Sequence, residues 1–118
     1  MTTGRVIECD VVVIGGGPAG VAAAVTLQRA GRQVTIIDKA TFPRDKSCGD
    51  GLTTAALREL EQLGLDPKSV ESWHRVDMVT VRAPFGQEVH FPLPADGTFA
   101  AVAPRIDLDA AVIDIARK

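Results

Sequence analysis

Three glycines have the spacing that most directly predicts a chemical task for this chain. Gly15, Gly17 and Gly20 form the pattern G-x-G-x-x-G, and the residues between the last two are Pro18 and Ala19. In a nucleotide-binding turn, the first glycine permits the turn and the second lets the backbone approach a pyrophosphate. The third lets a helix lie close against a strand. The pattern alone also fits a buried strand that ends in a tight turn, so its surroundings must decide between the two.

An acidic residue follows at the distance that a dinucleotide site requires. Asp38 ends the next apolar run, about 20 residues after the glycines. A carboxylate at this place accepts hydrogen bonds from both hydroxyls of an adenosine ribose, whereas it would repel a 2′-phosphate. The predicted ligand of this unit is therefore FAD or NAD rather than NADP.

The segments around the glycines must position them. Residues 9–14 form an apolar run broken only by Asp10, typical of a parallel strand covered on both faces, so we expect this strand in the middle of a sheet. A helix is predicted from Pro18 until Gly31 supplies a C-cap. Residues 32–38 then form a second strand. Strand, helix, strand and acid together favour dinucleotide binding over a plain glycine turn.

Composition limits the classes of protein to which the chain can belong. Its 118 residues match one domain, and a net charge of −2 lacks the basic excess that nucleic-acid binding would need. The sequence has two cysteines and no charged-then-apolar leader, which favours a reducing compartment and a cytoplasmic location. No apolar run approaches the roughly 20 residues of a transmembrane span.

The remaining segments predict further elements of an α/β fold. Residues 53–64 read as an amphipathic helix with a threonine cap and a glycine stop. Residues 76–93 contain two β-rich runs around a Pro-Phe-Gly turn, which indicates an antiparallel hairpin. No metal site is predicted, because three further candidate side chains have no partners at ligand spacing and suit surface or packing roles: Trp73, His74 and His90.

Taken together, these stretches resemble the amino-terminal part of the geranylgeranyl reductase family of FAD-dependent oxidoreductases. The first stretch that carries the resemblance is "DVVVIGGGPAGVAAAVTLQRAG". A second, "PRDKSCGDGLT" at residues 43–53, is similar to the reductase branch rather than to the related aromatic hydroxylases and flavin-dependent halogenases. A third, "VAPRIDLDAAVIDIA", matches an arginine-led helix of the wider superfamily. The resemblance covers nearly the whole chain but only the opening third or less of a typical member.

The resemblance implies a Rossmann-like FAD-binding fold, with a βαβ unit, a helix and an antiparallel hairpin. Its cofactor, FAD, would have its pyrophosphate over the three motif glycines together with Pro18 and Ala19. Asp38 and Lys39 would lie at the adenosine ribose. These positions are the core of the expected site.

A loop and a second arginine complete the implied site. The loop residues Arg44, Ser47, Cys48 and Gly49 would pass along the pyrophosphate, the ribityl chain and the flavin ring. Arg105 would approach the pyrophosphate or the ribityl chain from the far side. Two alternatives stay open: both arginines are solvated loop charges, or Cys48 only packs rather than contacting the flavin or reacting.

The implied activity is the reduction of isolated double bonds in a polyprenyl chain, as in a geranylgeranyl group or an isoprenoid quinone. Hydride would come from an external donor such as NAD(P)H, and no catalytic residue can be assigned. The location would be cytoplasmic, with peripheral contact to the membrane that holds the prenyl lipid. One alternative is a flavin-dependent monooxygenase or halogenase. An NAD-dependent dehydrogenase fits the first motif but leaves "PRDKSCGDG" unexplained.

We also expect the fold to be incomplete at its C-terminus. A doubly wound flavin domain places its first strand between two neighbours, and one of them would come from sequence after Lys118. Residues 1–118 are thus predicted to be a partial FAD-binding domain without the substrate domain. The expected partner is the remainder of the flavoprotein, and a further alternative is a non-catalytic nucleotide-binding fragment that needs a partner chain.

Overall fold

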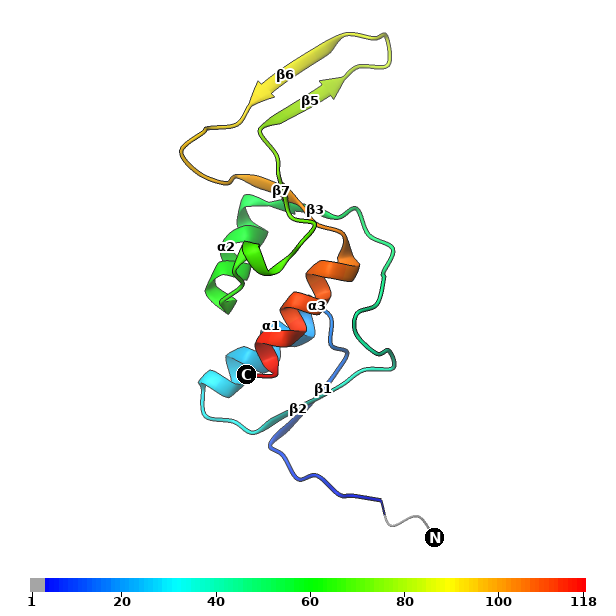
Figure 1. The fold of residues 1–118 in the computed structure, drawn as a ribbon, viewed down its shortest axis with the longest axis vertical. Helices are drawn as coiled ribbons and strands as arrows, with labels where there is room; N and C mark the ends of the chain where they lie inside the picture. Colours follow the sequence, from blue (N-terminus) through cyan, green and yellow to red (C-terminus); the bar gives the residue numbers. More distant parts are fainter. Residues whose placement is uncertain (1–3) are drawn as a thin grey trace.

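The computed structural model describes residues 4–118, which form the α/β fold predicted from the sequence (Figure 1). Seven strands, three α-helices and a short 3₁₀ helix follow one another along the described chain. In order they are β1 (Val11–Ile14), α1 (Pro18–Arg29), β2 (Val34–Ile37), β3 (Gly51–Thr53), α2 (Thr54–Leu63), the 3₁₀ helix η1 (Pro67–Ser69), β4 (His74–Arg75), β5 (Met78–Arg82), β6 (Glu88–Pro92), β7 (Ala100–Val102) and α3 (Arg105–Ala116).

The predicted strand–helix–strand unit is present. β1 and β2 pair in parallel, and α1 connects them. Pro18 occupies the first turn of α1, where its missing N–H costs no hydrogen bond. Gly31 follows the helix with φ of +80°, and its N–H donates to the carbonyl oxygen of Gln28, which ends α1 as expected.

Within residues 4–118 the first strand is neither central nor covered on both faces, and the second neighbour expected for it is not among these residues. β1 pairs with β2 alone among residues 4–118, and Val12 and Ile14 are 53% and 85% exposed. Successive strand side chains point to opposite faces, and α1 covers only one of them. Both strands are shorter than predicted. β1 begins at Val11 rather than at residue 9, and β2 spans Val34–Ile37 rather than residues 32–38.

The hydrophobic core lies among the three helices rather than around the sheet. α1 and α3 pack side by side (Figure 1), and Val21 and Val112 are completely buried between them. The full cluster is Val21, Val25, Leu60, Leu65, Val70, Ala103, Leu108, Val112 and Ile113. The predicted helix at 53–64 is confirmed as α2: the Thr53 side chain accepts from the N–H of Ala56, and Gly64 ends the helix with φ of 96°.

Two antiparallel sheets complete the structure. The predicted hairpin is confirmed as β5–β6, and it projects from the helices (Figure 1). One of its faces is apolar and exposed, with Val79 opposite Phe91 and Val81 opposite Val89. The small sheet β3–β7–β4 was not predicted. The radius of gyration of 18.1 Å exceeds the about 13 Å of a compact domain of roughly 100 residues, consistent with this projection.

Candidate dinucleotide-binding site

The glycine loop has the geometry that its spacing predicts. Gly15 adopts φ of +107°, a conformation that other residues rarely take. A Cβ atom on Gly20 would lie 1.8 Å from the carbonyl oxygen of Gly15, so α1 can approach the turn only without a side chain there. Gly17 is the N-cap of α1, and no side chain caps that helix end. The free backbone N–H groups at such an end form a favourable place for an anion.

Asp38 directly follows β2 and is hydrogen-bonded to the glycine loop. Its Oδ2 accepts a hydrogen bond of 2.7 Å from the backbone N–H of Gly16, and its Oδ1 accepts one of 2.8 Å from that of Ala40. The Ala40 and Gly16 N–H groups lower the pKa of the Asp38 carboxyl below its ordinary value. The carboxylate is therefore held charged beside the predicted nucleotide, while its contact with a ribose stays a prediction.

A hollow of about 770 Å³ opens beside the glycine loop. It is lined by five of the residues assigned to FAD from the sequence: Gly15, Gly17, Asp38, Lys39 and Arg44. Three others, Pro18, Ala19 and Gly20, form the first turn of α1 directly after that loop. The loop after β2 also brings Lys46 and Asp45 to this hollow, so three cationic side chains and two carboxylates line it.

The two predicted arginines meet at a carboxylate that the sequence analysis missed. Asp109 of α3 has no exposed surface. The Nη1 of Arg44 lies 2.6 Å from its Oδ2, and Arg105 donates from Nε and Nη2 at 2.7 and 2.9 Å. The side chains of Arg44 and Arg105 are 18% and 15% exposed, so the alternative that both are solvated loop charges is wrong. A signal for Asp109 was its position four residues after Arg105 in a mostly apolar helix.

Cys48 belongs to the same group of side chains. It is exposed on the loop between β2 and β3, and a hydrogen bond from Arg105 lowers the pKa of its thiol. The backbone N–H of Asp50 adds to this effect. The thiolate is therefore favoured relative to an ordinary cysteine. The neighbouring Ser47 and Gly49 are exposed, and neither lines the hollow beside the glycine loop.

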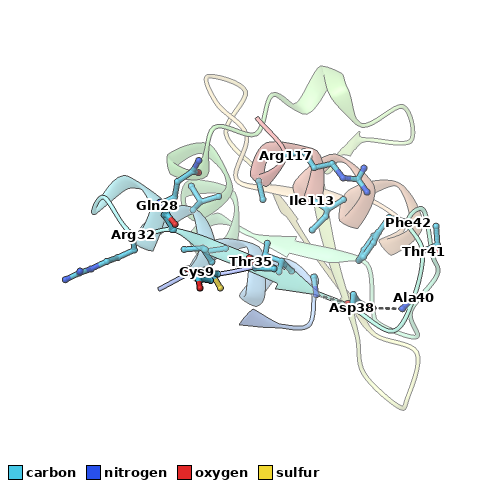
Figure 2. Close-up of a pocket in the computed structure, with 18 residues that line it drawn as sticks. Cys9, Gln28, Arg32, Thr35, Asp38, Ala40, Thr41, Phe42, Ile113 and Arg117 are labelled. Carbon is cyan, nitrogen blue, oxygen red and sulfur yellow. Dashed lines mark hydrogen bonds between the residues drawn. The ribbon is translucent and has the colours of Figure 1, made fainter. Parts of the chain in front are cut away.

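Figure 2 shows a different hollow, of about 780 Å³, between β2, α1 and α3. Cys9, Gln28 and Arg32 line one part, and Phe42, Ile113 and Arg117 line another. It shares Asp38 with the hollow at the glycine loop, but Gly17, Lys39 and Arg44 do not line it. The residues predicted to hold the pyrophosphate thus line the hollow at the glycine loop, although the two hollows are similar in size.

Two negative findings apply to residues 4–118 alone. No group of three or more His, Cys, Asp or Glu side chains there is arranged to hold a metal ion. None of the helices in this part of the chain has the length and apolar composition to cross a membrane. Trp73 packs against the hydrophobic core, whereas His90 contacts Thr80 on the exposed hairpin.

The fold and the loop define a Rossmann-like dinucleotide-binding unit. Comparison with known families is more specific: the family described as "FAD binding domain" matches residues 8–117. The chain therefore belongs to the FAD-binding domain family.

Individual relatives agree with this assignment. A menaquinone reductase of Mycobacterium tuberculosis (strain ATCC 25618 / H37Rv) is 46% identical over 111 residues, which cover 92% of this chain and 27% of the relative. The digeranylgeranylglycerophospholipid reductase 2 of Methanopyrus kandleri is 36% identical over 92 residues, covering 77% of this chain and 22% of the relative. Among solved structures, the flavin-dependent brominase Bmp2 superposes with a TM-score of 0.77 at 28% identity, covering 94% of this chain and 27% of the brominase.

The residues present fit FAD. The glycine loop leaves backbone exposed where a pyrophosphate would lie, the α1 end lacks a side-chain cap, and cations line the hollow. The chain spans about a quarter of the length of the curated relatives that it matches. The chain belongs to the FAD-binding domain family, and this membership does not by itself define the reaction of a longer protein.

Proposed function

We propose that this chain is the FAD-binding part of an oxidoreductase that reduces double bonds of a polyprenyl substrate. The observation that carries the proposal is the similarity to two reductases, 46% and 36% identical, over most of this chain. Their names give menaquinone and a digeranylgeranyl glycerophospholipid as substrates. Both molecules carry polyisoprenyl chains, so a geranylgeranyl group or an isoprenoid quinone is the proposed substrate class.

In this proposal the residues of the chain bind and orient the cofactor. The N–H groups at the start of α1 donate to the pyrophosphate, and Asp38 accepts from the adenosine ribose. Arg44 and Arg105 offset the pyrophosphate charge, and the loop with Ser47, Cys48 and Gly49 runs toward the flavin. When bound, FAD would carry hydride from an external donor to the double bond.

The proposal includes partners outside this chain. Residues 1–118 would form a partial FAD-binding domain, with the substrate pocket supplied by the remainder of a longer flavoprotein. The span of 27% of the first relative supports this division. The electron donor would be NAD(P)H, and the prenyl lipid would be reached in the cytoplasm at the membrane periphery.

Flavin content is the first test of this proposal. The chain is purified, freed of small ligands and examined by visible spectroscopy, and flavin released on denaturation is quantified. One FAD per chain supports the proposal, and reduction of a geranylgeranyl lipid or menaquinone by the full-length flavoprotein with NAD(P)H is then assayed. A protein that stays colourless after incubation with FAD contradicts FAD binding by this chain alone. It favours the alternative of a fragment that needs its partner.

Flavin-dependent halogenation or oxygenation is a second candidate, favoured by the similarity to the brominase Bmp2 at 28% identity. The two functions consume different reactants. Oxygen uptake by the flavin-loaded, full-length protein without loss of prenyl double bonds would support the oxygen-dependent function. Loss of double bonds under anaerobic conditions would support the reductase.

A further inference from the structure

Asp109 is a buried carboxylate to which the proposed function gives no task. It has no exposed surface, although a buried charge is costly unless it is paired. Both of its oxygens are engaged: Oδ1 accepts from Arg105, and Oδ2 accepts from Arg105 and from Arg44. Asp109, Arg44 and Arg105 together carry one net positive charge, counting these three side chains alone.

Arg44 connects this cluster to the glycine loop. Its Nη1 donates to Asp109 at 2.6 Å, and its Nη2 lies 3.5 Å from the point where a Cβ atom on Gly17 would stand. Its guanidinium also lies 4.9 Å from the centre of the Phe42 ring. The plane of the guanidinium thus has Asp109 on one edge and the N-cap of α1 at another. The guanidinium can point one nitrogen at Asp109 and a different one toward the α1 end, whereas all the donors of an ammonium group share one nitrogen.

We propose that Asp109 is a positioning residue that, paired with Arg105, holds Arg44 near the amino end of α1, with the Arg44 charge toward a bound pyrophosphate. The inference rests on the proposed FAD site and adds to it the residue that organises its cations. Arginine side chains that Asp109 already fixes in place lose little conformational entropy when a ligand binds, and this increases the affinity. The competing explanation is that the three side chains only stabilise the packing of α3 against the loop.

The first test replaces the carboxylate with its uncharged isostere and compares two ligands. ADP carries a pyrophosphate and adenosine does not, so only ADP reports on the arginines. We expect Asp109→Asn to weaken ADP binding about tenfold or more, and adenosine binding less than twofold, by isothermal calorimetry. Asp114→Asn removes an exposed carboxylate from the same helix and should leave both affinities unchanged. Equal losses for ADP and adenosine would mean a structural role and would overturn the proposal.

A double-mutant cycle tests whether Asp109 acts through Arg44. If it does, Asp109→Asn should weaken ADP binding several-fold less in an Arg44→Met background than in the wild-type chain. If the losses of ADP binding free energy from Asp109→Asn and Arg44→Met simply added in the double variant, Asp109 would not act through Arg44, and the proposal would be overturned. Arg44→Lys gives a test that leaves Asp109 in place: we expect it to lose most of the ADP affinity that Arg44→Met loses. ADP binding at the wild-type level by Arg44→Lys would also overturn the proposal.

A ligand-free measurement separates this inference from the proposed function. In the NMR spectrum of the chain without nucleotide, Asp109→Asn should shift the amide signal of Gly17 and leave that of Gly31, at the opposite end of α1, in place. An unmoved Gly17 signal in a folded variant would overturn the positioning role. A shifted Gly17 signal in a chain whose wild-type form binds neither ADP nor FAD would support the arginine placement and contradict FAD binding by this chain alone. Should Asp109→Asn not fold, Arg44→Lys and Arg44→Met answer the same question.

Discussion

Gly20 is the residue whose replacement we expect the fold to tolerate least. A Cβ atom there would lie 1.8 Å from the carbonyl oxygen of Gly15, and both positions are fixed by backbone. Gly20→Ala should therefore force α1 away from the turn and lower the free energy of unfolding by about 3 kcal/mol or more. Urea unfolding followed by circular dichroism measures this difference.

Gly51 offers a matched control for Gly20. It is exposed, has an ordinary backbone conformation, and a Cβ there would come no closer than 3.7 Å to its nearest neighbour, the Gly49 oxygen. Gly51→Ala should change stability by less than about 0.5 kcal/mol. If both variants were equally stable, the close approach between turn and helix would not exist in solution.

Asp38 should make the stability of the chain depend on pH. Hydrogen bonds from Ala40 and Gly16 depress the folded-state pKa of its carboxyl below the ordinary 3.8. Because the folded state favours the charged form, the resulting stabilisation is fully present above pH 3.8 and is lost as the pH falls through the depressed value. Asp38→Asn should be less stable than the wild-type chain at neutral pH, and the difference should narrow in acid.

Urea unfolding of both proteins over a pH series checks this expectation. Glu59→Gln, which removes an exposed carboxylate from α2, should show no comparable narrowing. A difference between Asp38→Asn and wild type that stays constant from neutral pH into strong acid would mean that the carboxylate charge does not stabilise the loop.

The sequence could predict the site residues that belong to a local pattern. The glycines and Asp38 were located by spacing alone, and the structure brings them to one hollow. Asp109 was missed because its pairing with Arg44 spans 65 positions and depends on how α3 packs against the loop. No local period encodes a contact of this kind.

At the scale of elements, the β5–β6 hairpin should behave as a separate unit. Every residue of both strands is exposed, and the two strands pair with each other alone within the described chain. Gly86 in its turn has φ of +85°, so Gly86→Ala should cost about 1 kcal/mol within the hairpin. Hydrogen exchange should show about fivefold less protection in β5 and β6, with α1 and α3 unchanged. An equal loss of protection in the helices would mean that hairpin and core open together.

The elements that the sequence predicted were those with a repeating pattern or clear end signals. α1, α2 and the hairpin are examples, since caps and turn residues mark their ends. β3, β4 and β7 are only two or three residues long, too short for an alternating pattern. β1 was predicted as central because a continuous apolar run is typical of strands covered on both faces. The apolar residues of β1 do not reveal which strands within residues 4–118 pair with it.

At the scale of the whole molecule, the β1–β2 pair and the β5–β6 hairpin lie on opposite sides of the helices in an elongated shape. The principal extents are 67 × 30 × 23 Å, and Figure 1 places the β1–β2 pair below the helices and β5–β6 above them. The candidate site joins the ends of β1 and β2, the start of α1 and the long loop to β3. None of the residues that line this hollow belongs to the hairpin, so a ligand bound there would contact the glycine loop and the loop after β2 instead.

A pyrophosphate ligand should therefore stabilise one part of the molecule selectively. A ligand that binds only the folded chain, present at 100 times its dissociation constant, adds about 2.7 kcal/mol to the free energy of unfolding. ADP or FAD should raise the melting temperature and slow hydrogen exchange in α1 and α3, while the exchange of β5 and β6 stays unchanged because the hairpin opens locally. Adenosine at the same concentration, without phosphate for Arg44 or the α1 N–H groups, should give a smaller shift. Equal stabilisation by adenosine and ADP would mean that the glycine loop does not receive a pyrophosphate, whereas slower exchange in the hairpin would mean that it is coupled to the nucleotide site.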